Sequence, residues 1–292
     1  MKNTGFSEIT EERLQYRGND PWYLEVSVTG RCNFNCRYCN RFNCEIDINI
    51  LENFLKSTVQ LKHIQVTGGE PTVHDDFDTI VKLCRKHTQK LGLSTNGSAD
   101  LDKYLSCPAD MFSISLDDYD LDILEKRGYK NPQHVVHVIK ELSKSKYVNV
   151  GLYVDALNFT RVEEIVDYIL SLGAHDVKIS TALGLLPVFI KDYDEKHPIL
   201  HYRVVNFKNG LPMRGRPAEH CHIIGNDITI VGEQHYPCLV YFREHGAAIG
   251  NVTDWETMRI ERENWIDRTD CTKDNICKRY CMDFKCEFNS SF

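Results

Sequence analysis

The chain has 292 residues, enough for one large domain with an appendage, and its 42% hydrophobic content is typical of globular proteins. The formal net charge is −7 and no five like charges follow one another, which argues against a nucleic-acid groove, a polyanionic substrate or an anionic membrane surface. Residues 1–20 lack the apolar stretch of a signal peptide, and the longest apolar stretch, 182–190, is too short to span a bilayer, so we expect a cytoplasmic protein.

The strands and helices predicted along the first two-thirds of the chain alternate. Residues 1–21 give little signal beyond a short helix at 9–14. The run 22–29 predicts a strand, followed by a cysteine-bearing loop and a helix at 50–59. Five further strands, separated by amphipathic helices, are predicted at 63–67, 91–95, 110–116, 147–155 and 177–181. This alternation predicts an α/β fold, a partial six-stranded parallel (β/α)6 barrel with right-handed crossovers.

Five of the six predicted strands have an apolar face and a polar face. In the first strand the apolar face is Leu24, Val26 and Val28, and the polar face is Glu25, Ser27 and Thr29. A closed eight-stranded barrel would fill its interior with branched apolar side chains. We therefore expect an open barrel with a polar lumen and with helices over its apolar faces. A sheet with one face in solvent is the alternative, which the flanking helices disfavour.

The rhythm of strands and helices ends after residue 182, and 182–220 is predicted to be an irregular, proline-containing connection. A β-hairpin is predicted at 227–231 and 235–239, between Cys221 and Cys238, and a helix is predicted around 255–265. We divide the chain into an N-terminal segment (1–21), the partial barrel (22–185) and a cysteine-rich hairpin and helix extension (186–292).

Cysteines are concentrated in two stretches of the chain. Of twelve, four lie within 32–44 and six within 221–286, and in a reducing compartment they favour metal or redox chemistry over disulfides. Cys32, Cys36 and Cys39 form a CxxxCxxC motif, with Tyr38 before its last cysteine. Three thiolates can bind three irons of a cubane cluster and leave the fourth iron open to the amino and carboxylate groups of an amino acid. Half of a zinc site is the alternative.

Further motifs end the second, third and fourth predicted strands, where parallel α/β folds bind ligands. Together with the cysteines, this order of motifs resembles the radical SAM superfamily. The resemblance implies a 4Fe-4S cluster and S-adenosylmethionine (SAM) as cofactors, and it implies which residues hold them. The segment Gly68, Gly69, Glu70 and Pro71 would bind the methionine amino group, Ser94, Asn96, Ser115 and Asp117 would contact its carboxylate and the ribose, and Tyr38 would border the adenine.

The C-terminal cysteines resemble the SPASM and twitch extensions of that superfamily, which implies at least one auxiliary 4Fe-4S cluster. We expect Cys221 and Cys238 to hold it with two of the four terminal cysteines, Cys271, Cys277, Cys281 and Cys286. Arg268 stands where the full motif has a ligand, so a second cluster would need an open or non-cysteine site. Structural zinc is the alternative for these thiols.

The resemblance implies that the chain cleaves SAM reductively and abstracts hydrogen from a polar substrate. The implied substrates are a peptide that is oxidised, epimerised or cross-linked, or an alcohol or sugar-like molecule. Tyr153, Asp155 and Lys178 are predicted to face the lumen and act on the substrate, and a flavodoxin or ferredoxin would supply electrons. A non-catalytic iron–sulfur electron-transfer or scaffold protein is the alternative, which the complete SAM-binding segments argue against.

Overall fold

The computed structural model of the chain describes residues 11–39, 42–181, 200–203, 217–281 and 288–289. Their strands form one ten-stranded sheet in the order β10-β9-β8-β1-β2-β3-β4-β5-β6-β7. The strands are β1 (Tyr23–Ser27), β2 (Leu61–Thr67), β3 (Thr88–Thr95), β4 (Met111–Ser115), β5 (Tyr147–Val154), β6 (Asp176–Thr181), β7 (Leu200–Arg203), β8 (Asp227–Val231), β9 (Gln234–Tyr236) and β10 (Gly250–Asn251).

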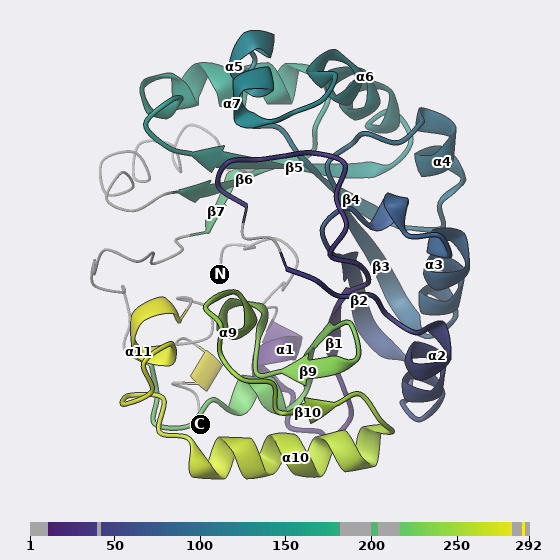
Figure 1. Cartoon of the computed structure of the whole chain (residues 1–292), viewed down its shortest axis with the longest axis vertical. Coiled ribbons are helices and arrows are strands. Elements are labelled where there is room, and N and C mark those ends of the chain that lie inside the picture. The colour runs from purple at the N-terminus through teal and green to yellow at the C-terminus, as the bar shows by residue number, and fades with distance from the viewer. Residues whose placement is uncertain (1–10, 40–41, 182–199, 204–216, 282–287, 290–292) are drawn as a thin grey trace.

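Helices cover the outer side of the curved sheet, where α2 to α4 flank β2 and β3 and α5 to α7 lie over β4 to β6 (Figure 1). The barrel helices are α2 (Ile48–Lys56), α3 (Phe77–Lys86), α4 (Leu101–Ser106), α5 (Leu121–Arg127), α6 (Pro132–Leu142) and α7 (Val162–Ser171). Strands β1 to β6 are parallel, so the predicted α/β class and open parallel barrel are confirmed. No described helix is both long and apolar enough to cross a membrane.

The apolar faces of the strands make the core. Leu24, Val26 and Ile64 are fully buried and pack in one cluster with helix residues such as Leu51 and Ile139. Burying a side chain of this size stabilises the fold by about 1.5–3 kcal/mol relative to leaving it exposed. The period-two alternation therefore fixes which side of each strand meets the helices, as the sequence predicted.

The opposite faces of the strands carry polar groups that bond to one another. Gln65 on β2 is 1% exposed, and its Nε2 donates to Ser94 Oγ on β3 at 3.0 Å. His63 lies two residues earlier on the same face, with Nε2 3.3 Å from Gln65 Oε1. Cross-strand bonds of this kind satisfy polar groups inside the barrel, in agreement with the polar lumen expected from the sequence.

The C-terminal hairpin differs from the prediction in its connections. Strand β8 pairs in parallel with β1, with Ile228 opposite Leu24, so the hairpin extends the barrel sheet instead of forming a separate module. The second strand of the hairpin, β9, ends at Tyr236, and Cys238 instead caps the N-terminus of helix α9 (Leu239–Arg243). Local pattern specifies a hairpin but not the distant strand that it joins, which explains the error. The domain boundary at 185/186 stays a prediction.

Two buried arginines attach the outer elements to this hairpin. Arg262 on helix α10 (Trp255–Arg268) is fully buried and donates to the carbonyl oxygens of Ile224, Asp227 and Tyr236. Arg13 on the short helix α1 (Glu11–Gln15) forms a 2.8 Å ion pair with Asp227. Residues 11–21 of the N-terminal segment, which carried little signal in the sequence, therefore pack against the C-terminal hairpin through Arg13.

Candidate functional site: a cysteine loop and a cysteine-lined cavity

The CxxxCxxC loop follows the carboxyl end of β1 and is held by backbone contacts to the end of α5. Asn35 N donates to Gly128 O at 3.1 Å, and Arg37 N donates to Arg127 O at 3.3 Å. Gly128 has a φ of +102°, and a Cβ atom there would lie 2.2 Å from Asn35 O. Only glycine combines this left-handed backbone with so close an approach, so Gly128 lets α5 end directly against the cysteine loop.

The three thiols of this loop differ in exposure: Cys32 and Cys36 are partly buried, whereas Cys39 is exposed. Cys32 Sγ accepts hydrogen bonds from Phe34 N at 3.4 Å and from Asn96 Nδ2 at 3.7 Å. Burial raises the pKa of the Cys36 thiol to about 12, so without a bound cation this thiol would stay protonated at neutral pH. A cationic iron would favour the thiolate.

The surroundings of these three thiols suit an iron–sulfur cluster better than a single metal ion. In the described ranges, no three His, Cys, Asp or Glu residues are grouped to hold a single ion. The thiolates of a cubane cluster bind different irons, so they lie further apart than the ligands of one ion. Amide donors directed at Cys32 sulfur are the kind of outer contact that tunes such clusters, so the donor set and its surroundings fit an iron–sulfur cluster.

The Gly-Gly-Glu-Pro segment after β2 packs against the entrance to the cysteine loop. Gly69 N donates to Thr29 O at 2.7 Å, and Glu70 N donates to Arg31 O at 2.8 Å. A Cβ on Gly69 would lie 2.3 Å from Arg31 O, which leaves no space for a side chain. The two motifs, separated by about 30 residues in sequence, are therefore parts of one structure.

The Glu70 side chain is hydrogen-bonded within the chain. Its carboxylate is fully buried and accepts hydrogen bonds from Thr72 N at 3.1 Å, Thr72 Oγ1 at 2.6 Å, Thr95 Oγ1 at 2.8 Å and Asn96 N at 2.6 Å. A carboxylate with four such donors is already well satisfied. These bonds join the loops after β2 and β3. The predicted contact of Glu70 with a ligand ammonium group stays a prediction.

Asp117 and Tyr38 meet at the end of β4. Asp117 is 1% exposed and accepts hydrogen bonds from the Tyr38 hydroxyl and from Tyr153 N, the latter at 2.8 Å. The Tyr38 ring stacks on the Tyr153 ring, with centroids 4.2 Å apart and planes at 21°. The structure thus brings three predicted site residues together. It also shows that the Asp117 carboxylate, which we expected to contact ribose, is already bonded within the chain.

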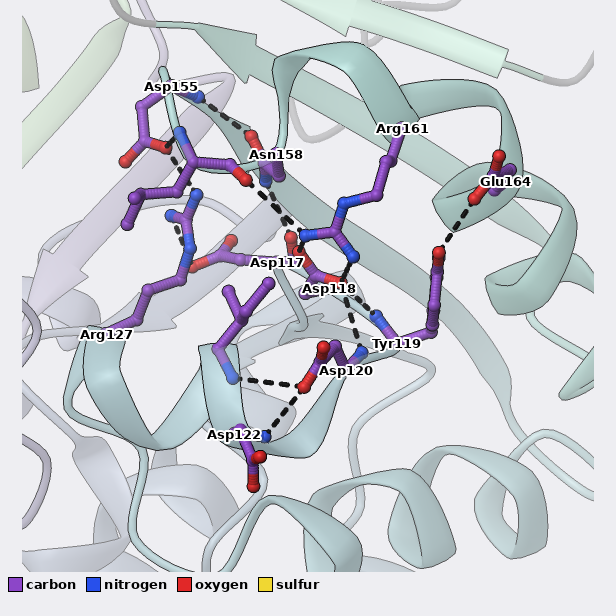
Figure 2. A network of polar contacts seen from close by, with 12 residues as sticks. Asp117, Asp118, Tyr119, Asp120, Asp122, Arg127, Asp155, Asn158, Arg161 and Glu164 are labelled. Carbon is purple, nitrogen blue, oxygen red and sulfur yellow. Dashed lines mark hydrogen bonds and ion pairs between the residues drawn. The ribbon is translucent and has the colours of Figure 1, made fainter.

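Arg127, at the C-terminus of α5, is a site residue that the sequence analysis missed. Its Nη2 lies 2.5 Å from Asp155 Oδ1, and its Nη1 lies 3.7 Å from Asp117 Oδ2, so the guanidinium lies between two carboxylates (Figure 2). The side chain is 1% exposed, yet within the described residues Nε and Nη1 have no hydrogen-bond acceptor. The only sequence signal was a basic helix end followed by Gly128.

Asn158 holds the ends of β4 and β5 in register at this place (Figure 2). It is fully buried, and its Nδ2 donates to Asp117 O at 2.7 Å and to Tyr153 O at 2.9 Å. Its Oδ1 accepts from Asp155 N at 2.9 Å. The backbone that carries Tyr153 and Asp155 is therefore fixed by one amide side chain.

A second ion pair, between Asp118 and Arg161, connects the β4–α5 loop to the residues before α7. Asp118 is fully buried and accepts from Arg161 Nη1 at 3.1 Å and Nη2 at 2.7 Å (Figure 2). The neighbouring Tyr119 hydroxyl donates to Glu164 on α7 at 2.7 Å. These contacts attach the β4–α5 loop to α7.

The remaining predicted lumen residues lie on neighbouring strands. Ser115 is opposite Gly151 on β5, which is opposite Lys178 on β6, so the three share one row across the sheet. Lys178 is 9% exposed. Among the described residues other than its two chain neighbours, the nearest atom to a Cβ on Gly151 would be Ile114 O at 4.0 Å, so these residues leave space at the centre of the row.

Five of the six C-terminal cysteines line one cavity of about 480 Å³, a volume that includes solvent at its mouth. They are Cys221, Cys238, Cys271, Cys277 and Cys281. The predicted ligand Cys286 lies outside the described residues. The other walls are mostly apolar and include Ile224, Pro237, Val240, Tyr241 and Trp265. None of the eleven described cysteines forms a disulfide.

Polar hydrogens point at the sulfurs of this cavity. Tyr241 N donates to Cys238 Sγ and Asn289 Nδ2 donates to Cys221 Sγ, both at 3.4 Å. The thiols of Cys221 and Cys277 lie near that of Cys271 and shift its pKa. Thiols that line one apolar cavity with N–H donors around them form a donor set suited to an iron–sulfur cluster.

Comparison with known proteins agrees with this arrangement. Residues 26–169 match the family model of the radical SAM superfamily. The chain is 29% identical over 222 residues to the tungsten-containing aldehyde ferredoxin oxidoreductase cofactor-modifying protein of Pyrococcus furiosus, covering 65% of this chain and 61% of that protein. It is 33% identical over 138 residues to GTP 3′,8-cyclase of Aliarcobacter butzleri, covering 42% and 43%. The chain thus spans less than two-thirds of these curated relatives.

Two groups of solved structures share the fold. Native anSMEcpe with bound AdoMet and the Cp18Cys peptide has a TM-score of 0.62 at 17% identity, covering 93% of this chain and 95% of that one. Streptococcus suis SuiB bound to the precursor peptide SuiA has a TM-score of 0.61 at 14% identity, covering 89% and 66%. The chain belongs to the radical SAM superfamily, a superfamily of enzymes. Membership of this family implies a 4Fe-4S cluster and SAM as cofactors.

Proposed function

We propose that the chain cleaves SAM reductively and uses the resulting 5′-deoxyadenosyl radical to abstract hydrogen from a polar substrate, foremost a peptide. The observation that carries this proposal is the convergence of three motifs. Asn96 Nδ2 contacts Cys32 Sγ while Asn96 N is bonded to Glu70, so the cysteine loop and both predicted SAM-binding segments meet at one point. When bound, the cluster supplies the electron that breaks the sulfur–carbon bond of SAM.

The residues around the cysteine loop would bind and orient SAM. Cys32, Cys36 and Cys39 would hold the cluster, and the tightly packed backbone of Gly68 and Gly69 would approach the amino group. Arg127 has two buried nitrogens in need of an acceptor, and a carboxylate is the acceptor that a guanidinium binds most strongly. We therefore propose that the guanidinium of Arg127 binds the carboxylate of the methionine part of SAM. The roles of Ser94, Asn96 and Ser115 in SAM binding and of Tyr38 beside the adenine stay predictions.

A peptide substrate is supported by the solved structures, because anSMEcpe and SuiB have been crystallised with peptides. In this chain the substrate would lie in the lumen beside Tyr153, Lys178 and the open row at Gly151. The structure alters the expectation for Asp155. Its carboxylate is paired with Arg127, so we propose that it positions Arg127 in addition to any contact with substrate.

The cavity with five cysteines supports an auxiliary 4Fe-4S cluster held by Cys221, Cys238 and two terminal cysteines. One auxiliary cluster predicts about eight irons per chain together with the first cluster, and two predict about twelve. Iron and zinc analysis of anaerobically reconstituted protein tests this. About four irons with bound zinc would contradict an auxiliary cluster and leave the cavity a structural zinc site.

The proposed reaction is tested by incubating reconstituted protein with dithionite and SAM and measuring 5′-deoxyadenosine by chromatography. We expect product from the wild-type chain and none from the Cys32→Ala/Cys36→Ala/Cys39→Ala variant. A Cys84→Ala variant is the matched control, because Cys84 lies in the helix-packed core and away from both cysteine sites. Equal product from the wild type and the triple variant would contradict the proposal.

A further inference from the structure

Two asparagine side chains lie beside the first cysteine of the loop. Asn33 directly follows Cys32, and Asn96 comes from the loop after β3 and is 9% exposed. Asn96 Nδ2 lies 3.7 Å from Cys32 Sγ and 2.8 Å from Asn33 Oδ1, within hydrogen-bond distance of both acceptors. The two hydrogens of one amide nitrogen are therefore shared between a sulfur and an oxygen.

The backbone of Ser98 determines which way the Asn96 amide faces. Asn96 Oδ1 accepts a hydrogen bond from Ser98 N at 3.0 Å. A backbone N–H can only donate, so the amide oxygen lies on the Ser98 side and the amide nitrogen on the Cys32 side. The group that meets the cysteine sulfur is therefore a hydrogen-bond donor.

The orientation of the Asn33 amide follows from that of Asn96. Because Asn96 presents its nitrogen, the Asn33 atom that it meets is the carbonyl oxygen, and Asn33 Nδ2 donates to Ser98 Oγ at 2.8 Å. Turning the Asn96 amide over would place its oxygen against Asn33 Oδ1 and Cys32 Sγ, where no hydrogen is available from Asn33. The network of Asn33, Asn96 and Ser98 thus selects one orientation.

The backbone that carries Asn96 is also held in place. Asn96 N donates to Glu70 Oε2 at 2.6 Å, and Glu70 is fully buried. The next residue, Gly97, has a φ of +75°, and a Cβ there would lie 3.0 Å from side-chain atoms of Ile114 and Val135. Glycine allows this left-handed turn to pack closely against the core. With the backbone held, the side-chain torsions of Asn96 are what Asn33 and Ser98 have left to fix.

We propose that Asn33 is a positioning residue that holds the Asn96 amide with an N–H toward the Cys32 sulfur, and that the pair thereby raises the reduction potential of the bound cluster. This rests on the proposed function, because it needs a cluster on the three loop cysteines. Reduction adds one electron and breaks no bond, so the reduced cluster carries more negative charge. An N–H donor stabilises the reduced cluster more than the oxidised one, and hydrogen bonds to the sulfurs are among the features that set cluster potentials.

A redox titration of the reconstituted protein, followed by electron paramagnetic resonance, tests the pair directly. The reduced-cluster signal that is missing from Cys32→Ala/Cys36→Ala/Cys39→Ala belongs to the loop, and its midpoint potential is measured without SAM. We expect Asn96→Ala to lower the equilibrium constant for reduction by about tenfold, a shift of about 59 mV to more negative potential for one electron. Asn33→Ala should shift the midpoint in the same direction by less, because the donor remains but is no longer held.

A double variant separates positioning from a direct effect of Asn33 on the cluster. If Asn33 acts through Asn96, Asn33→Ala/Asn96→Ala should have the same midpoint as Asn96→Ala alone. Additive shifts would overturn the positioning role. Should Asn96→Ala take up no cluster, Asn33→Ala decides by itself, because an unchanged midpoint in that variant overturns the proposal.

The matched control is Asn35→Ala, which makes the same substitution in the same loop. Asn35 is exposed, and its bond to Gly128 uses the backbone N, which alanine keeps. We expect the wild-type midpoint in this control. A shift in Asn35→Ala as large as that in Asn33→Ala would overturn the proposal, as would an unchanged midpoint in Asn96→Ala.

Failure of this inference and failure of the proposed function can be told apart. A wild-type protein without any reduced-cluster signal that depends on the loop cysteines would count against the proposed function. A normal signal whose midpoint is the same in the wild type, Asn33→Ala and Asn96→Ala would overturn the asparagine pair alone. Lower SAM affinity in Asn96→Ala with an unchanged midpoint would also overturn it, and would show that this amide binds SAM instead.

Discussion

At the scale of single residues, Arg127 is a buried side chain with hydrogen-bond donors available for a ligand. Its guanidinium is buried with only part of its donors used, and an unsatisfied buried donor costs about 1–3 kcal/mol. A bound carboxylate would remove that cost. Arg127→Lys keeps the charge but cannot make the same planar, two-donor contact.

We expect Arg127→Lys to weaken SAM binding by about 1.5–3 kcal/mol, which is the range for hydrogen bonds to charged groups. Anaerobic equilibrium dialysis with labelled SAM measures this. Lys126→Gln, one residue earlier and exposed, should bind SAM as the wild type does. Wild-type affinity in Arg127→Lys would show that the methionine carboxylate lies elsewhere.

Asp155 has two candidate roles, contact with the substrate and pairing with Arg127, which the sequence alone could not distinguish. Strand alternation predicted that it contacts substrate, whereas the structure pairs it with Arg127 at 2.5 Å. Asp155→Asn removes the nearer of the two carboxylates beside the buried guanidinium and leaves only Asp117, so we expect both SAM affinity and substrate turnover to fall. If SAM affinity is unchanged while turnover is lost, Asp155 acts on substrate, as the alternation predicted.

At the level of elements, the cysteine loop depends on how α5 ends. Gly128→Ala would impose a side chain on a φ of +102° and push its Cβ into Asn35 O. Gly173→Ala is a matched control, because Gly173 has a φ of +95° but its added Cβ would meet only Ser143 Cβ at 3.5 Å. Both changes place a Cβ on a left-handed backbone, which costs about 1–2 kcal/mol, but only the first displaces the loop. We expect Gly128→Ala to lose iron from the first cluster after reconstitution, and Gly173→Ala to retain it. Equal iron content would contradict this coupling.

Packing between β9 and α10 gives the protein a pH-dependent stability. His235 is fully buried, and burial, with the nearby Arg262 charge, lowers its pKa to about 3. The unfolded chain would protonate this histidine near pH 6.5, so the unfolded state binds more protons between about pH 6.5 and 3. The stability that the neutral His235 contributes is therefore complete above about pH 6.5 and is lost as pH falls.

We expect the free energy of unfolding in urea to decrease from pH 7 to pH 5 in the wild type, and to decrease less in His235→Gln, which cannot be protonated. Comparing the two proteins removes the contribution of carboxyl groups that titrate in the same range. The same pH dependence in both would show that His235 is not responsible.

On the scale of the whole molecule, local sequence patterns predicted most of the barrel. The alternation of Leu24, Val26 and Ile64 with polar residues specified which strand faces are buried, because burial of apolar area depends on a period of two. The pairing of β8 with β1 joins segments about 200 residues apart and has no local signal. The cysteine spacing singled out five thiols that the structure brings to one cavity, and their role as metal ligands stays a prediction. It could not show that Glu70 is bonded within the chain or that Arg127 is buried beside Asp117, because these contacts depend on how separate loops meet.

The central claim is that the cysteine loop holds a cluster with one iron open to SAM. Electron–nuclear double resonance of the reduced, reconstituted protein with SAM carrying nitrogen-15 in its amino group tests this claim directly. We expect a hyperfine coupling between nitrogen-15 and the cluster spin, which is absent when unlabelled SAM is used. A normal reduced-cluster signal without nitrogen-15 coupling, at SAM concentrations that saturate binding, would contradict the account.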